Sequence, residues 1–165
     1  NVRCTREAYG DTDASGLSSI RRGFKRRSLA FHSTWMDVAT AKKCVSYIGT
    51  YNAFDPAYVA DALDALPTPS AVAVGREGSP VVYVWTTEPR DAMAAFEAID
   101  DKAAADAEET MKELGRDPKM GRSKIRGPDE LGGIVDADSY PVRTVGHPLE
   151  TMPSDKPTLV RCWWD

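Results

Sequence analysis

The sequence has few of the residues that build metal centres and disulfide frameworks. It contains two histidines and three cysteines, and Cys4, Cys44 and Cys162 are widely spaced with no Cys-x-x-Cys pair. A zinc site would need ligands from distant parts of the chain, and an odd set of cysteines is a poor disulfide framework. We therefore predict free thiols and an intracellular, reducing compartment, with one bridge and a spare thiol as the alternative.

Long apolar runs and catalytic signatures are also lacking. No run reaches the length of a membrane helix, no secretory signal is found, and no internal repeat is found. Neither a Gly-x-Gly-x-x-Gly nor a Gly-Lys-Ser/Thr phosphate loop is present, nor a Gly-x-Ser-x-Gly or His-Glu-x-x-His site. The sequence therefore predicts no cofactor and no metal, and it favours a protein that is not an enzyme. The chain begins at Asn1 rather than at Met, which leaves open the removal of an organelle-targeting peptide.

Charge is divided unevenly along the chain, although the net charge is only −4. Residues 1–31 carry seven basic and three acidic side chains, a net charge of +4, whereas residues 51–117 carry fourteen acidic and five basic ones, a net charge of −9. The two segments are expected to attract each other or different partners. Neither balance is extreme enough to indicate nucleic acid by itself.

The clearest strand signals form a hairpin. Residues 71–74 and 81–85 are apolar and rich in β-branched side chains, and the glycines and proline of residues 75–80 suit a hairpin loop. Because the apolar runs are nearly continuous, both faces of this hairpin are expected to be covered. The two faces would carry Val81, Tyr83 and Trp85 on one side and Val82 and Val84 on the other.

A long helix follows the hairpin directly. It is predicted from about Glu88 to Leu114, because Pro89 suits a first turn and Gly115 stops a helix. Apolar residues recur at steps of three and four and make one stripe, namely Met93, Phe96, Ile99, Ala103, Ala107, Met111 and Leu114. The other faces are mainly acidic, so the stripe is expected to pack on the hairpin.

Two shorter helices are predicted before the hairpin. The first would be capped by Ser33, with Asp37 in its early turns and Gly49 just beyond its end. The second has Asp55 as its cap and Pro56 at its first position, and it stops before two closely spaced prolines.

These elements predict an α+β fold. An antiparallel sheet built on the hairpin, about 70–86, would pack against the long helix, about 88–114, with one or two shorter N-terminal helices and extended terminal tails. The chain then divides into a basic extended arm, residues 1–31, a compact α+β core, residues 32–115, and a Pro-rich loop and extended C-terminal segment, residues 116–165. The third segment has room for strands at the edge of the sheet.

The two ends of the chain hold the candidate partner-binding residues. The arm interleaves bases with an aromatic, and a run ending in two tryptophans is unusually apolar for a terminal segment. Tryptophan is favoured at interface anchors, so this run is expected to dock either onto the chain's own core or into another subunit. The candidate partner-binding residues are Arg21, Arg22, Phe24, Arg26, Arg27, Trp163 and Trp164.

The leading hypothesis is a non-catalytic accessory or structural subunit of a larger protein assembly. One alternative is a small enzyme whose site is assembled from dispersed side chains, the candidates being Asp136, Asp138, His32, His147 and Cys44. Another is a nucleic-acid-binding module that uses the basic segments from Ile20 to Ser28 and from Lys119 to Arg126. A solvated arm and a solvated loop that neutralises the acidic helix are the plainer interpretations of these two segments.

Overall fold

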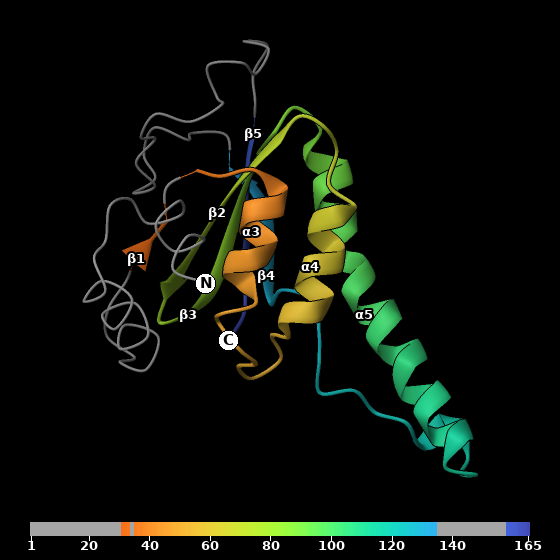
Figure 1. Cartoon of the computed structure of the whole chain (residues 1–165). Helices are drawn as coiled ribbons and strands as arrows, with labels where there is room; N and C mark the ends of the chain where they lie inside the picture. Colours follow the sequence, from red (N-terminus) through yellow and green to blue (C-terminus); the bar gives the residue numbers. More distant parts are fainter. Residues whose placement is uncertain (1–30, 34, 135–157) are drawn as a thin grey trace.

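The computed structural model describes residues 31–33, 35–134 and 158–165. In this part of the chain, three α-helices lie on one face of a five-stranded antiparallel sheet (Figure 1). The strands are β1 (Phe31–His32), β2 (Ser70–Glu77), β3 (Ser79–Thr86), β4 (Glu130–Ile134) and β5 (Thr158–Trp163), in the order β1-β2-β3-β5-β4. The helices are α3 (Val38–Val45), α4 (Pro56–Asp64) and α5 (Pro89–Glu113), followed by a short 3-10 helix, η1 (Pro118–Met120). The predicted α+β fold is confirmed.

The hairpin is tighter than the sequence predicts. The pairing of β2 with β3 continues to Glu77 and Ser79, so Gly78 alone lies between the strands. Gly78 has a φ of +79°, which glycine adopts without strain. Its carbonyl accepts a hydrogen bond from Arg76 Nε at 2.8 Å, and Arg76 is only 1% exposed. The predicted six-residue loop is therefore wrong, because paired backbone and this contact extend both strands into it.

The sheet has two apolar faces, as the near-continuous apolar runs predict. Val82 and Val84 belong to the main core under the helices, together with Phe96 of α5. The opposite face, called here the second face, carries the other set of alternating residues. The second face consists of Ala71, Ala73, Val81, Tyr83 and Leu159, with Trp35 packed among them and Trp85 and Trp163 partly buried against them.

The C-terminal strand is an interior strand rather than an edge strand. β5 pairs with β3 on one side and with β4 on the other, so β4 is the edge strand of this half of the sheet. Leu159, Val160 and Cys162 are buried. The prolines that precede this run favour an edge position, but none of them lies within β5, and every residue of the strand can take part in pairing.

The cap of the first helix differs from the prediction. Ser33 is buried beside β2, where its N–H donates to the Val74 carbonyl at 2.8 Å and its hydroxyl accepts from the Val74 N–H at 2.9 Å. Its hydroxyl is therefore committed to the sheet, and Asp37 caps α3 by accepting from the Thr40 N–H at 2.6 Å. The predicted cap of α4 is confirmed, because Asp55 accepts from the Ala57 N–H at 2.8 Å.

The long helix α5 begins and ends where the sequence predicts. The Glu88 N–H donates to the Thr86 hydroxyl just before the helix, and Pro89 is its first residue. At the other end Gly115 has a φ of +64° and donates to the Lys112 carbonyl, while the Arg116 N–H donates to the Met111 carbonyl. This pair of bonds is a Schellman motif, which satisfies carbonyls that the helix end leaves open. No helix among the described residues is long and apolar enough to cross a membrane.

Candidate partner-docking surface

The two predicted docking segments are described to different extents. The arm residues Arg21, Arg22, Phe24, Arg26 and Arg27 lie outside the described residues. In β5, Trp163 is partly buried against the second face, and the Arg161 guanidinium lies 5.8 Å from the centre of its ring. Of the predicted partner-binding side chains, Trp163 alone is therefore both described and partly exposed.

Trp164 is a core residue. It is 0% exposed, and its ring makes edge-to-face contacts with Phe54 and Phe96 at centroid distances of 5.0 and 6.1 Å. Its indole N–H donates to the Arg126 carbonyl at 3.1 Å. Of the two expected destinations for this tryptophan, the chain's own core is the one observed. Trp164 is therefore not available to a partner, and burial of its ring ties β5 to α5 and to the segment before β4.

The residues of the alternative enzyme site are not brought together within the described chain. Asp136, Asp138 and His147 lie outside the described residues. His32 lies in β1, where its backbone is paired with Gly75 of β2. Cys44 is buried on the inner side of α3. No group of three potential metal ligands occurs in residues 31–33, 35–134 and 158–165. The enzyme hypothesis therefore stays an untested prediction.

Cysteine chemistry is disfavoured at the other described thiol. Cys162 is a free cysteine, and its side chain is fully buried in β5 between β3 and β4. Burial raises the pKa of the Cys162 thiol well above its ordinary value, despite the opposing effect of Arg161. Because the thiolate is the nucleophile, this thiol is unreactive near neutral pH.

The most distinctive exposed feature is the C-terminal half of α5. Ala92, Phe96, Ile99 and Ala103 are the buried residues of this helix, so burial against the core ends at Ala103. The helix has 25 residues and is therefore about 37 Å long, whereas the eight-residue strands are about 26 Å long. Figure 1 shows α5 extending beyond the sheet and the other helices, with η1 beside its far end. Residues 104–121 are called here the projecting end.

The projecting end is stabilised by the chain that returns along it. The Gly121 backbone lies so close to α5 that a side chain there would meet the Ala107 carbonyl oxygen at 2.7 Å. Farther along, the Gly127 N–H donates to Asp100 Oδ1 at 3.2 Å. Residues 118–127, called here the return segment, therefore run antiparallel to α5. This places the exposed bases of the segment beside an acidic helix. Those bases are Lys119, Arg122, Lys124 and Arg126.

Apolar side chains are exposed at the projecting end. Leu114 is 61% exposed and Met120 is 70% exposed, and only Tyr47, at 43%, is comparable among the large apolar residues of the described chain. Leu114 is the last member of the apolar stripe of α5, and nothing in the core reaches it. An exposed leucine at a helix end and an exposed methionine on the short helix packed beside it can fill an apolar pocket in another protein.

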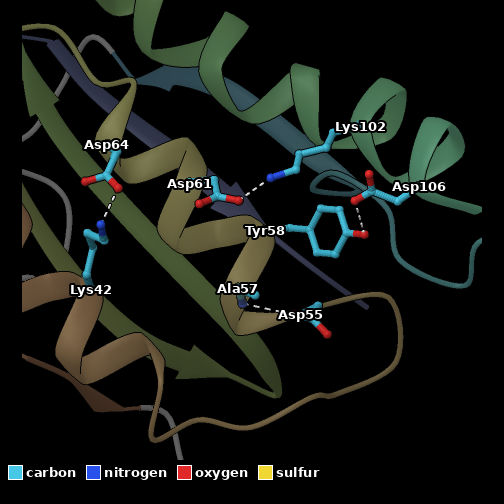
Figure 2. A network of polar contacts seen from close by, with 8 residues as sticks. All are labelled: Lys42, Asp55, Ala57, Tyr58, Asp61, Asp64, Lys102 and Asp106. Atoms are coloured by element: carbon cyan, nitrogen blue, oxygen red, sulfur yellow. Dashed lines mark hydrogen bonds and ion pairs between the residues drawn. The ribbon is translucent and has the colours of Figure 1, made fainter. Parts of the chain in front are cut away.

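A polar network fastens α4 between the other two helices (Figure 2). Asp64 pairs with Lys42 of α3, and Asp61 pairs with Lys102 of α5. The Tyr58 hydroxyl donates to Asp106 Oδ2 at 2.7 Å, and Lys102 Nζ lies 5.4 Å from the centre of the Tyr58 ring. These side chains point toward one another from neighbouring helices, so the network holds the base of the projecting end in place.

The hydrogen bond to Asp106 changes the acidity of Tyr58. It raises the pKa of Tyr58 to about 12, with smaller contributions from burial and from the charges of Asp106, Asp55 and Asp61. The pKa of Lys102 is also raised, mainly by its hydrogen bond to Asp61. Both shifts favour the protonated forms that the network uses at neutral pH. At neutral pH the network therefore acts as a structural support.

Sequence reasoning did not identify the projecting end. The apolar stripe reads as continuous from Met93 to Leu114, but the core covers it only as far as Ala103. Length was the signal that could have identified this end, because a helix of about 27 residues exceeds strands of five to eight residues. Comparisons of the chain with protein-family models, with curated proteins and with solved structures found no match.

Proposed function

We propose that this protein is a non-catalytic accessory or structural subunit of a larger protein assembly. The observation that carries the proposal is the projecting end, where Leu114 at the end of α5 and Met120 of η1, which packs beside that end, are both exposed. A braced helix end has already lost most of its conformational freedom, so a partner that buries these side chains pays little ordering cost. The exposed apolar tip is therefore a favourable anchor for a protein partner.

The N-terminal arm belongs to the same proposal. Its bases and Phe24 suit an acidic surface on another subunit, and a basic arm would speed encounter with such a surface at low salt. Trp163 is partly exposed and stays a proposed partner contact. Trp164 is fully buried and is no longer proposed as one. A reducing compartment stays part of the proposal, and it agrees with the burial of Cys44 and Cys162, neither of which forms a disulfide.

The first test is the mass of the native particle. The protein is purified from its source without denaturation and sized, and the co-purifying chains are identified with their stoichiometry. We expect a stoichiometric assembly well above the 18.0 kDa of the chain. Elution of the whole pool as an 18.0 kDa monomer would contradict the proposal.

A paired substitution tests which surface is used. Leu114→Glu combined with Met120→Glu is expected to remove the protein from the assembly while its own unfolding midpoint changes little, because both side chains are exposed. Ala94→Glu is the matched control, since it adds a charge to an exposed position of α5 before the projecting end. Loss of assembly in both variants, or in neither, would argue against docking at the projecting end.

Nucleic-acid binding is a second candidate function. The observation that favours it is the exposure of Lys119, Arg122, Lys124 and Arg126 along the return segment. The acidic helix beside them weakens the local positive potential, which is why protein docking is preferred. The test is binding of a mixed-sequence duplex and of single-stranded RNA at increasing salt, where phosphate contacts would make the affinity fall steeply. Absent or salt-independent binding would exclude this function.

A further inference from the structure

The two edges of the sheet differ in how their backbone groups are used. On the outer side of β2, the preceding chain supplies hydrogen bonds, since Ser33 donates to Val74 and Met36 exchanges bonds with Val72. On the outer side of β4 no described strand follows. The sheet therefore has, within the described chain, one covered edge and one open edge.

The strand register shows which groups of β4 face the open edge. Opposite residues of antiparallel strands alternate between pairs that exchange hydrogen bonds and pairs that do not. The Trp164 N–H donates to the Pro80 carbonyl at 3.1 Å, so every second residue of β5, counted from Thr158, bonds to β3 and the others bond to β4. The residues of β4 opposite these others are Glu130, Gly132 and Ile134. Leu131 and Gly133 therefore direct their backbone N–H and C=O groups outward.

The outward groups of β4 are open and unprotected. In the part of the chain that the structure describes, nothing bonds to the outward groups of Leu131 or Gly133. Proteins usually protect such an edge with Lys, Pro or a bulge, because open backbone groups pair with other strands. β4 contains neither Lys nor Pro, and its five residues pair with β5 in unbroken register. Its one charged side chain, that of Glu130, is held in an ion pair with Arg161 of β5.

The outward groups of β4 are complementary to those of a second copy of the same strand. When two β4 strands lie antiparallel about a two-fold axis at Gly132, Leu131 of each copy is opposite Gly133 of the other. Each of these two pairs can exchange both of its N–H···O=C bonds. Glu130 is then opposite Ile134 of the second copy, so no two acidic residues are paired. The register is therefore set by the outward groups themselves.

Side-chain packing favours the same register. Leu131 and Gly133 are paired with Cys162 and Val160, which belong to the main core, so both lie on the helix side of the sheet. Leu131 packs against that core but is only partly buried. Because Gly133 has no side chain, Leu131 of one copy has room to bury its exposed part over Gly133 of the other. The pairing therefore adds apolar contact to the backbone bonds.

We propose that two copies of this chain associate through β4, antiparallel about Gly132, so that their sheets join into one. The contact is one strand wide, and small interfaces give weak association, so the dimer forms at high protein concentration. The proposal goes beyond the proposed function and does not depend on it, because it concerns the edge of the sheet and not the projecting end.

Amide hydrogen exchange tests the pairing on the full chain. It is measured residue by residue by nuclear magnetic resonance, from low micromolar to millimolar protein. The amides of Leu131 and Gly133 are expected to exchange quickly in dilute solution and several-fold more slowly at the highest concentration. The Gly132 amide is the internal control, because it bonds to β5 and its exchange should not depend on concentration. Light scattering on the same samples should show the mass rising from 18.0 kDa toward twice that value.

A proline substitution tests whether β4 is the contact. Gly133→Pro removes an outward N–H and no bond to β5, and an edge strand tolerates proline at such a position. This variant is expected to keep its thermal transition and to remain a monomer, with fast exchange at Leu131 at every concentration. Gly132→Ala is the matched control, because it keeps every N–H and its Cβ meets no atom within 4 Å. It is expected to associate as the unchanged chain does.

Three results would overturn the proposal. The first is a monomer mass with fast exchange of Leu131 and Gly133 at all concentrations. The second is slow exchange of these two amides that does not change with concentration, which would mean that the chain itself covers the edge. The third is a dimer that persists in Gly133→Pro, which would place the contact elsewhere.

Discussion

At the scale of single residues, adjacent tryptophans in this chain have different roles. Trp163 and Trp164 follow one another, but alternation along β5 and its continuation directs them to opposite sides of the sheet. Trp164 enters the core between Phe54 and Phe96, whereas Trp163 lies on the second face. The two adjacent tryptophans are therefore one core residue, Trp164, and one partly exposed residue of the second face, Trp163.

Replacing each tryptophan by alanine distinguishes these roles. Trp164→Ala removes a fully buried ring and its bond to the Arg126 carbonyl, so we expect a loss of about 3–5 kcal/mol in the free energy of unfolding. Trp163→Ala is the control and is expected to cost less, because this ring is only partly buried. Urea unfolding measures both. Equal losses, or a larger loss for Trp163, would mean that Trp164 is not the core anchor described above.

Tyr58 predicts a pH dependence at the alkaline end. Its pKa is about 12 in the folded chain and about 10 when unfolded, so the unfolded state loses its proton first as pH rises. The stabilisation from the bond to Asp106 is therefore complete below pH 10 and is lost as the pH rises toward 12. Ultraviolet titration of tyrosinate should show one tyrosine near pH 12 that is missing in Tyr58→Phe. A titration unchanged by this substitution would contradict the bond.

At the scale of elements, local signals identify helices better than they identify neighbours in the sheet. Asp55 with Pro56 marks the start of α4, and Gly115 marks the end of α5, because each signal acts within one turn of chain. The place of β5 between β3 and β4 depends on residues far apart in sequence, and no local pattern encodes it. The predicted helix cap at Ser33 is wrong for the same reason, because the Ser33 hydroxyl accepts a hydrogen bond from Val74, which is distant in sequence.

The candidate site was predictable only in part. The arm and the terminal tryptophans stand out by composition, yet Trp164 is buried by partners from three distant segments. The exposed tip at Leu114 and Met120 follows from where the core ends along α5, which depends on packing. Periodicity alone could not separate the covered half of the stripe from the uncovered half.

The return segment beside α5 predicts a position-specific glycine effect. Gly121→Ala would place a methyl group 2.7 Å from the Ala107 carbonyl oxygen, so the segment must move away from the helix. We expect a loss of about 1–3 kcal/mol and faster hydrogen exchange in the last turns of α5. The backbone of Gly121 has a φ of −64°, which alanine tolerates, so the effect reports the contact alone.

Gly132→Ala is the control for this prediction. Gly132 lies in β4, and a Cβ there meets no atom within 4 Å. The substitution is expected to leave the free energy of unfolding nearly unchanged and exchange in α5 unaffected. Similar losses for both glycines would show that Gly121 is not held against α5.

At the scale of the whole molecule, docking by the C-terminal run cannot be separated from folding by simple truncation. Removing residues 161–165 takes away half of an interior strand and the Trp164 anchor. We expect this variant to lose its cooperative thermal transition in circular dichroism. Deletion of Asp165 alone is the control and is expected to retain the transition, because Asp165 is exposed and contributes one bond, to Asp129. A cooperative transition in the longer truncation would contradict the interior role of β5.

The interior place of β5 also governs when the protein can fold during its synthesis. β4 pairs with β5 and, among the described strands, with no other, while β3 has one open side until β5 arrives. The emerging chain can therefore form its helices and the β2–β3 hairpin early, but its sheet stays divided until residues 158–163 have left the ribosome. During that interval β3 presents an unpaired, strongly apolar edge, which is the moment of greatest risk of aggregation and of greatest use for a chaperone.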